Sequence, residues 1–231
     1  MKKLRYFTKT ELGLWGGSVA LIAAAFLAFD GRDWLTLWAS LIGVTSLIFS
    51  AKGNPVGQGL MILFSLLYGI ISWRFSYYGE MITYLGMTMP MAVFALIAWL
   101  RNPFAGNRAQ VAVGKLKPME YWLLPVLTAV VTVGSYYILA YFHTANLLPS
   151  TLSVTTSFVA VYLTFRRSPF FALAYAANDV VLMVLWAMAA WEDISYLSVL
   201  ICFAVFLVND LYGFLSWRRM ARRQAAQQEP R

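Results

Sequence analysis

Two stretches of the chain, LIFSAKGNP at residues 47–55 and VYLTFRRSP at residues 161–169, share one pattern. Each closes an apolar, hydroxyl-containing segment with a basic turn and a proline, a residue well suited to the first turn of a new helix. The segments that follow the two stretches align at a constant offset of 118 residues. The aligned pairs are Leu67 with Leu185, Tyr68 with Trp186, Trp73 with Trp191, Tyr78 with Tyr196, Phe94 with Tyr212, Trp99 with Trp217 and Arg101 with Arg219. The chain therefore contains an internal repeat.

The composition is that of a membrane protein. Of 231 residues, 61% are hydrophobic and 12% are charged, and the mean hydropathy is +0.66. A soluble domain of this length could not bury so much apolar surface. Segments long enough to cross a hydrocarbon layer, roughly 20 residues of helix, occupy 11–29, 34–51, 56–74, 80–100, 119–142, 148–165, 170–190 and 194–217. We predict eight transmembrane helices.

The repeat arranges these eight helices. Helices two to four and six to eight form the two repeat units, and because one helix separates them, both units enter the membrane in the same direction. Transporters that are built from a parallel repeat of this kind bind substrate between the repeats near mid-membrane. We therefore expect an all-α integral membrane protein with an N-terminal helix and a parallel 3+1+3 repeat. The expected divisions are an N-terminal transmembrane helix at 1–33, a first three-helix repeat with its cytoplasmic loop at 34–117, a linker helix at 118–147, a second three-helix repeat at 148–217 and a basic cytoplasmic tail at 218–231.

Basic residues account for the net charge of +8 and are concentrated in alternate loops. The loops on the side of the termini carry Lys2, Lys3, Arg5, Lys9, Lys52, Arg101, Arg108, Lys115, Lys117, Arg166, Arg167, Arg218, Arg219, Arg222, Arg223 and Arg231. Only Arg32 and Arg74 fall on the other side. This positive-inside pattern predicts that both termini are cytoplasmic. The basic tail is expected to contact anionic lipid rather than nucleic acid.

The opposite loops are acidic, and tryptophan marks the helix ends. Asp30, Asp33, Glu192 and Asp193 fall in outer loops, where they either attract a cationic solute or are simply solvated. Tryptophan near a span end is expected to be an interfacial anchor. The residues in this class are Trp15, Trp34, Trp38, Trp73, Trp99, Trp122, Trp191 and Trp217. Trp186 lies a full turn inside its helix and is instead a candidate ligand contact.

Two Asn-Asp pairs, Asn178-Asp179 and Asn209-Asp210, lie inside the last two apolar segments. Such groups at membrane depth are costly unless paired or facing a wet cavity, so they are functional candidates by default. At 1.5 Å per residue, Asp179 lies about 15 Å and Asp210 about 11 Å from the cytoplasmic ends of their antiparallel helices, so we expect similar depths. The alternative is that these side chains only fasten helices together.

Helical spacing adds companions to these pairs. Asp179 and Trp186 share one helix face, Gln58 and Tyr68 line the third helix, and Glu80 begins the fourth. These side chains predict a slot that stacks a flat ring and hydrogen-bonds a sugar or amide. The candidate substrate-binding residues are Gln58, Tyr68, Glu80, Thr88, Asn178, Asp179, Trp186, Asn209, Asp210 and Tyr212.

Three further runs resemble the PnuC family of bacterial vitamin-precursor transporters, near its Neisseria-type members. They are YYGEMI at 77–82, AANDVVLMVLW at 176–186 and the most specific, LVNDLYGFLSWRRM at 207–220. The resemblance covers essentially the whole chain and implies a fold similar to the SWEET sugar transporters. One departure is Thr83, where many members have asparagine.

The resemblance also implies a function. It implies uptake of nicotinamide riboside through the bacterial inner membrane by facilitated diffusion, without a coupling ion, followed by trapping through phosphorylation by a cytosolic kinase. It implies a homotrimer as well. The matching site positions are Trp186, Asn178, Asp179, Asn209, Asp210, Tyr212, Gln58 and Glu80. Related proteins carry thiamine or riboflavin, which are the alternative substrates.

No catalytic residue, cofactor or metal is expected. The lone cysteine, Cys202, can form no internal disulfide, and the lone histidine, His143, is in a loop without an HExxH motif. A distant alternative is an intramembrane hydrolase that uses two aspartates as acid and base, but the glycine context usual for such a protease is missing. A scaffold or sensor would not account for the repeat.

Overall fold

The computed structural model describes residues 6–74, 78–144 and 146–228. Within these residues, eight helical segments are long and apolar enough to cross a membrane, which confirms the predicted number. They are Lys9–Asp30, Trp34–Ala51, Val56–Arg74, Tyr78–Leu100, Glu120–Tyr141, Leu147–Phe165, Phe171–Glu192 and Ile194–Gln228. Of the residues used above, Lys2, Lys3, Arg5, Tyr77 and Arg231 lie outside the described ranges.

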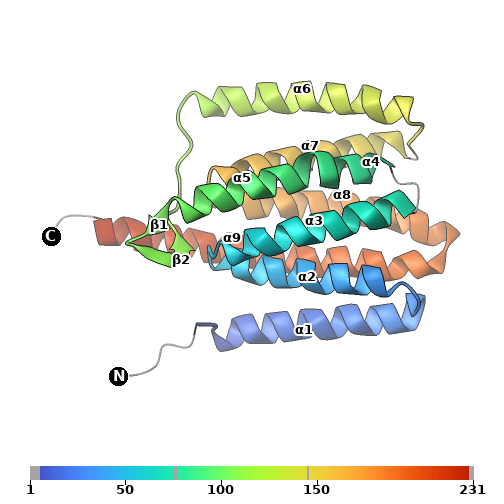
Figure 1. Ribbon diagram of the computed structural model, residues 1–231, viewed down its shortest axis with the longest axis horizontal. Helices are drawn as coiled ribbons and strands as arrows, with labels where there is room; N and C mark the ends of the chain where they lie inside the picture. The colour runs from blue at the N-terminus through green and yellow to red at the C-terminus, as the bar shows by residue number, and fades with distance from the viewer. Residues whose placement is uncertain (1–5, 75–77, 145, 229–231) are drawn as a thin grey trace.

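The helices run side by side along the long axis of the molecule, with α1 at one edge and α6 at the other (Figure 1). In chain order the elements are α1 (Lys9–Ala25), η1 (Phe26–Asp30), α2 (Trp34–Ala51), α3 (Val56–Arg74), α4 (Tyr78–Ile82), η2 (Thr83–Thr88), α5 (Met89–Leu100), β1 (Pro103–Phe104), β2 (Asn107–Val111), α6 (Glu120–Tyr141), α7 (Leu147–Phe165), α8 (Phe171–Glu192), η3 (Ile194–Tyr196) and α9 (Leu197–Gln228). The start of α1 and the end of α9 lie at the same end of the molecule.

The two repeats pack against each other through their first and last helices. The first repeat comprises α2, α3 and the α4–η2–α5 segment, and the second comprises α7, α8 and α9. The first helix of each repeat packs against the last helix of the other, α2 against α9 and α7 against α5. Each half therefore completes the core of the other, as a pseudo-twofold arrangement requires.

Trp99 and Trp217 show this symmetry most directly. Both are fully buried, and their rings contact each other with centroids 5.3 Å apart and planes tilted by 50°. The Trp99 indole donates to the Thr164 carbonyl at 3.0 Å, and the Trp217 indole donates to the Ser50 carbonyl at 2.7 Å. Each tryptophan thus bonds the opposite repeat, at carbonyls that occupy equivalent places in the two stretches quoted first.

The expectation that Trp99 and Trp217 are interfacial anchors is therefore wrong. Position near a helix end does not reveal whether a side chain points outward or toward the repeat axis. The other end-of-helix tryptophans are exposed in the structure, as interfacial anchors would be: Trp15, Trp34, Trp38, Trp73, Trp122 and Trp191.

The segment between α5 and α6, which the sequence predicts to be a loop, contains a short antiparallel hairpin of β1 and β2. It ties the two repeat turns together. The Val111 N–H donates to the Gly53 carbonyl and the Gly114 N–H donates to the Arg167 carbonyl, both at 2.9 Å. Gly53 and Arg167 are equivalent turn residues, and both have positive φ, 66° and 57°.

Helix α9 continues to Gln228, well past residue 217, where we expected the span to end. Its extension is held by the hairpin, because the Gln224 side chain accepts from the Val113 N–H at 2.8 Å and donates to the Val111 carbonyl at 3.0 Å. Amphipathic sequence beyond a span does not reveal such an anchor. Residues 218–228 of the predicted basic tail therefore continue α9 as a helix.

Helices α2 and α3 approach closely at Gly57. A Cβ atom there would lie 2.6 Å from the Ser50 backbone nitrogen, and the Gly57 carbonyl accepts from the Ser46 hydroxyl at 2.8 Å. Gly59 lies two residues further along the same helix, and a Cβ atom added there would have no neighbour within 4 Å. Small residues at such contacts let membrane helices pack backbone against backbone.

We expect Gly57→Ala to lower the midpoint of thermal unfolding, since a methyl group there must push two backbones apart at a cost of about 1–3 kcal/mol. Gly59→Ala is the matched control and should raise the midpoint or leave it unchanged, because alanine is the better helix former by about 1 kcal/mol. The measurement is thermal unfolding in detergent. Equal effects of the two substitutions would contradict this packing.

Candidate functional site

An aromatic cluster fills the space between the repeats. Tyr68 of α3 lies at its centre, with ring centroids 4.5 Å from Tyr84, 5.9 Å from Phe203 and 6.5 Å from Trp186. Phe64 adds an edge contact to Tyr84 at 5.8 Å. Tyr68 and Trp186 are equivalent positions of the repeat, so this pair, like Trp99 and Trp217, lies where the two halves meet.

Polar groups face this cluster without being fully bonded. The Tyr68 hydroxyl lies beside Glu80 and Trp186. Glu80 is buried, and neither of its carboxylate oxygens has a hydrogen bond of good geometry within the described residues. The hydroxyls of Ser65 and Ser72, on the same helix as Tyr68, also lack partners there. Buried polar groups in this state are expected where a ligand or water completes them.

Asp179 and Asp210 are neighbours, as the depth argument predicted. Their carboxyl groups are close enough to interact with each other, and Oδ2 of Asp179 has no hydrogen-bond partner among the described residues. Both side chains are buried. Two carboxylates this close cannot both be ionised without strong repulsion. The pair therefore holds a proton or faces a cation.

Buried charge in the described part of the chain is entirely acidic. The buried acids are Glu11, Glu80, Glu120, Asp179 and Asp210, while no lysine or arginine side chain is buried there. Glu11 and Glu120 lie at helix starts and are neutralised by Lys52 and Arg166. The three acids near the aromatic cluster have no such ion pair within the described residues. These carboxyl groups are therefore left to hold a proton or to interact with a solute.

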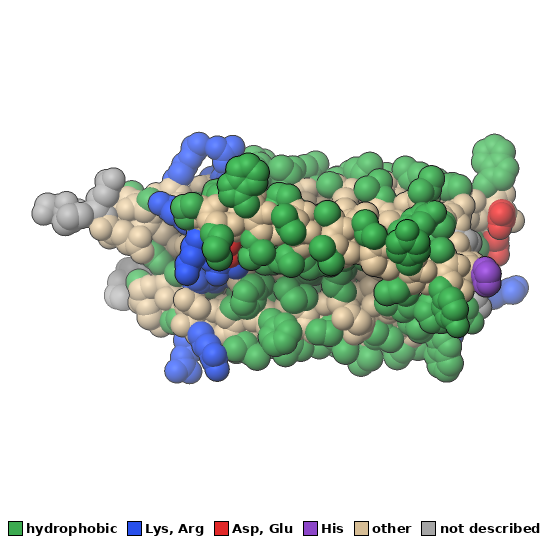
Figure 2. Space-filling model, turned by 90° about the horizontal axis from the view of Figure 1, so that it is seen from above, with side chains coloured by type: hydrophobic (Ala, Val, Ile, Leu, Met, Phe, Trp, Pro, Cys, Tyr) green, Lys and Arg blue, Asp and Glu red, His purple; other side chains and the backbone are tan. Residues whose placement is uncertain are grey.

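Two cavities approach the cluster from one end of the molecule. One, of about 40 Å³, is lined by Asp30, Asp33, Tyr68 and Trp186 among others. The second, of about 210 Å³, reaches Glu80 past Glu192. Figure 2 shows the more prominent acidic side chains and the histidine, His143, at this end, and most of the visible Lys and Arg at the opposite end, where a smaller acidic patch lies among them.

The acidic end stays charged at its surface. The Ser195 backbone N–H donates to Asp193 at 2.9 Å, and this hydrogen bond lowers the pKa of that exposed carboxyl. Asp30 accepts from the backbone N–H groups of Arg32 and Asp33, and Asp33 accepts from the Leu35 N–H and from the Thr36 hydroxyl at the start of α2. A cation nearing this end meets negative potential before it reaches Tyr68 and Trp186.

Asn178 serves as a hydrogen-bond hub between α7 and α8. Its carbonyl oxygen accepts from the hydroxyls of Thr156 at 2.8 Å, Ser157 at 3.0 Å and Ser153 at 3.5 Å. Asn209 is likewise engaged through its amide nitrogen, which donates to Ser18 of α1 and to a backbone carbonyl of its own helix. Its own oxygen has no partner within the described residues. These contacts match the alternative in which asparagines fasten helices.

Gln58 and Tyr212 lie toward the basic end, away from the aromatic cluster. Gln58 precedes Tyr68 by ten residues of the same helix, roughly 15 Å, and its side chain contacts Ser50 at 3.4 Å. The Tyr212 hydroxyl donates to Glu11 at 3.2 Å. Thr88 is buried at the end of the π-helical segment η2. The predicted set therefore divides into a central group and a group at the basic end.

Glu11 is a structural residue that the sequence analysis did not single out. It forms a capping box with Thr8 at the start of α1. The same carboxylate accepts from Lys52 at 3.2 Å and from Tyr212, which joins α1, α2 and α9. The pattern Thr-x-x-Glu before an apolar run could have predicted the cap, but not the two distant partners. Among the described residues, no group of three or more metal-ligating side chains is present.

Comparison with known proteins gives a consistent picture. Residues 33–219 match the model of a family described as nicotinamide mononucleotide transporter. A nicotinamide riboside transporter of Neisseria mucosa is 29% identical over 212 residues, 89% of this chain and 80% of that protein. A nicotinamide riboside transporter of Haemophilus influenzae is 21% identical over 197 residues, 83% of this chain and 82% of that protein.

The fold has been observed before. A crystal structure described as the vitamin B3 transporter PnuC matches with a TM-score of 0.82 over 94% of each chain, at 22% identity. At that identity the match shows the fold alone. It agrees with the predicted all-helical membrane architecture.

We expect Asn178→Ala to lower thermal stability, because three hydroxyls lose a shared acceptor. A double-mutant cycle with Ser157→Ala should give a coupling of about 0.6–1.7 kcal/mol, as for interhelical hydrogen bonds in membranes. The readout is thermal unfolding of the four proteins in the cycle. Additive effects would mean that Asn178 does not fasten α7 to α8 and would return it to the set of ligand contacts.

Proposed function

Because residues 33–219 match its model, the chain belongs to the nicotinamide mononucleotide transporter family, and we propose that it carries nicotinamide riboside through a bacterial inner membrane. It is a membrane transporter and not an enzyme, which sets aside the intramembrane hydrolase. The observation that carries the choice of substrate is the aromatic cluster surrounded by buried acids without counter-ions.

The riboside suits this site better than its phosphate ester. The riboside combines a fixed pyridinium charge with a carboxamide and a neutral ribose. The positive ring can stack against Trp186 or Tyr68 through a cation–π contact, and Glu80 and Asp179 can accept from hydroxyl or amide groups. A phosphate would meet these carboxyls with no buried lysine or arginine in the described residues to balance it. Thiamine, which is also cationic and aromatic, is the first alternative substrate, and riboflavin is the second.

Transport is proposed to follow the substrate gradient alone. The three central acids are Glu80, Asp179 and Asp210. They form no chain of carboxyls from one end to the other, since the acids that reach the basic end are Glu11 and Glu120 in ion pairs. Net uptake then depends on cytosolic phosphorylation, which removes the riboside and gives it a charge that the central site disfavours.

The basic end is proposed to face the cytoplasm, by the positive-inside rule. In this orientation the two cavities open to the outer side, and the Trp99–Trp217 layer lies on the inner side of the aromatic cluster. A cysteine at Asn107, an exposed hairpin residue, should react with an impermeant maleimide only after cells are permeabilised. The native Cys202 is buried and is the background control. Labelling of this cysteine in intact cells would show that the basic end faces outward.

A homotrimer is proposed as well, on the family resemblance. Helix α6 could supply the contact between copies, because among the described elements this helix packs mainly against α7. Its outward face carries exposed apolar side chains: Trp122, Val126, Val130, Val133 and Tyr137. This face is available to lipid or to a neighbouring copy.

Uptake into proteoliposomes tests the function. We expect radiolabelled nicotinamide riboside to enter until its internal and external concentrations are equal, and faster than thiamine, riboflavin or nicotinamide mononucleotide. An imposed proton or sodium gradient should not change the end point, whereas an entrapped riboside kinase with ATP should. Accumulation of unphosphorylated riboside on an ion gradient would contradict facilitated diffusion. Faster entry of thiamine than of nicotinamide riboside would identify thiamine as the substrate.

Trp186→Ala should weaken riboside binding by about 1–3 kcal/mol, the range for desolvated aromatic and cation–π contacts. Trp191→Ala is the matched control, because Trp191 ends the same helix with 93% of its surface exposed. Isothermal titration of the folded variants measures both. Equal losses, or no loss for Trp186, would place the site elsewhere. Trp217→Ala is unsuitable as a control, since Trp217 is fully buried.

A further inference from the structure

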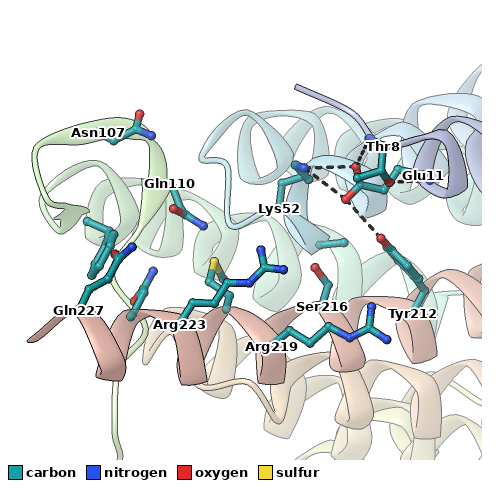
Figure 3. A pocket seen from close by; sticks show the side chains of 14 residues that line it. Thr8, Glu11, Lys52, Asn107, Gln110, Tyr212, Ser216, Arg219, Arg223 and Gln227 are labelled. Atoms are coloured by element: carbon teal, nitrogen blue, oxygen red, sulfur yellow. Dashed lines mark hydrogen bonds and ion pairs between the residues drawn. The ribbon is translucent and has the colours of Figure 1, made fainter. Parts of the chain in front are cut away.

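A large cavity lies apart from the central cluster. It lies at the basic end and has a volume of about 690 Å³, within the range of small-molecule sites. Its walls come from the start of α1, the end of α2, the β hairpin and the extension of α9 (Figure 3). The proposed transport function leaves it without a role.

The charge of this cavity is positive. Lys52, Arg219 and Arg223 line it against one carboxylate, Glu11, a net formal charge of +2. Glu11 is already engaged, since both of its oxygens lie 3.2 Å from the Lys52 ammonium. No carboxylate among the described residues forms an ion pair with Arg219 or Arg223, because the two ion pairs found there are Lys52–Glu11 and Arg166–Glu120. Two guanidinium groups are thus left to a ligand.

The spacing of the two arginines is unfavourable unless an anion is present. Arg219 and Arg223 are four residues apart on α9, so they share one face of the helix, and like charges in this arrangement repel. Figure 3 shows both side chains rising from α9 along the same cavity. Paired guanidinium groups match the oxygens of a phosphate, which they bind with two parallel hydrogen bonds each.

The remaining walls are hydrogen-bonding rather than apolar. Amide side chains of Asn107, Gln110 and Gln227 and the hydroxyl of Ser216 line the same space. The cavity is also larger than one phosphate group requires. Such walls suit the polar body of a phosphate ester, such as a sugar, or the glycerol headgroup of a phospholipid.

We propose that this cavity binds the phosphate group of an anionic ester, with Arg219 and Arg223 as the principal donors. The ester is either a soluble sugar phosphate or an anionic lipid headgroup, and the two share the same chemistry. The site is separate from the central cluster, where the buried charged groups are acidic. Its test does not depend on transport.

Isothermal titration with ribose 5-phosphate tests the soluble ester. The full chain is reconstituted in nanodiscs of phosphatidylcholine, and ribose without phosphate is the ligand control. We expect saturable binding of the phosphate ester only. Arg219→Gln with Arg223→Gln should weaken it by at least about tenfold, the loss expected for charge-assisted hydrogen bonds.

The control pair is Arg218→Gln with Arg222→Gln. These arginines lie on the same helix at the same spacing and carry the same charge, but they do not line the cavity. Affinity should stay close to that of the unsubstituted chain. Arg219→Lys with Arg223→Lys keeps the charge and should restore part of the binding. All four positions are exposed, so thermal unfolding should be little changed.

Native mass spectrometry of protein extracted from phosphatidylglycerol membranes tests the lipid. Retained phosphatidylglycerol that is lost on substituting Arg219 and Arg223, with no binding of ribose 5-phosphate, would identify a headgroup as the ester. Binding of ribose 5-phosphate would identify a soluble one. The proposal is overturned if neither ligand depends on these two arginines, or if the control pair causes an equal loss.

Discussion

The reciprocal hydrogen bonds of Trp99 and Trp217 are the contact on which the rest of the molecule depends. Each indole donates to a backbone carbonyl at the end of the first helix of the other repeat, and the two rings pack against each other at a tilt of 50°. In a membrane an unsatisfied buried N–H is expensive, so the bonds favour a single register of the two halves. In that register Tyr68 lies beside Trp186, with ring centroids 6.5 Å apart.

Buried polar groups divide according to whether the protein itself satisfies them. Asn178 collects hydroxyls from the neighbouring helix, and Glu11 and Glu120 are bonded to cations at the basic end. These groups hold helices together. Glu80 and Asp179 keep unbonded oxygens among aromatic rings. A low-dielectric interior makes an incomplete site costly, and a cationic, hydrogen-bonding solute that enters from the acidic end would relieve that cost.

The two ends of the molecule use charge differently. Carboxylates at the acidic end lie along the cavities that lead to Trp186 and Glu80. At the basic end, Arg219 and Arg223 line a separate cavity built by the hairpin and the long α9 helix. A neutral ribose attached to a cationic ring suits the first environment, and a phosphate suits the second. Phosphorylation of a cationic riboside would thus turn a ligand suited to the acidic end into one suited to the basic end.

The sequence by itself determined the eight spans and the repeat, because hydrophobic length and the spacing of aromatic residues are local properties. It also predicted that Asp179 and Asp210 meet, since depth follows from helical rise. It did not reveal which way Trp99 and Trp217 point, nor that Asn178 bonds three hydroxyls while Gln58 and Tyr212 lie toward the basic end. Those outcomes depend on how one helix is rotated against the next, and only the packing of the two repeats decides that rotation.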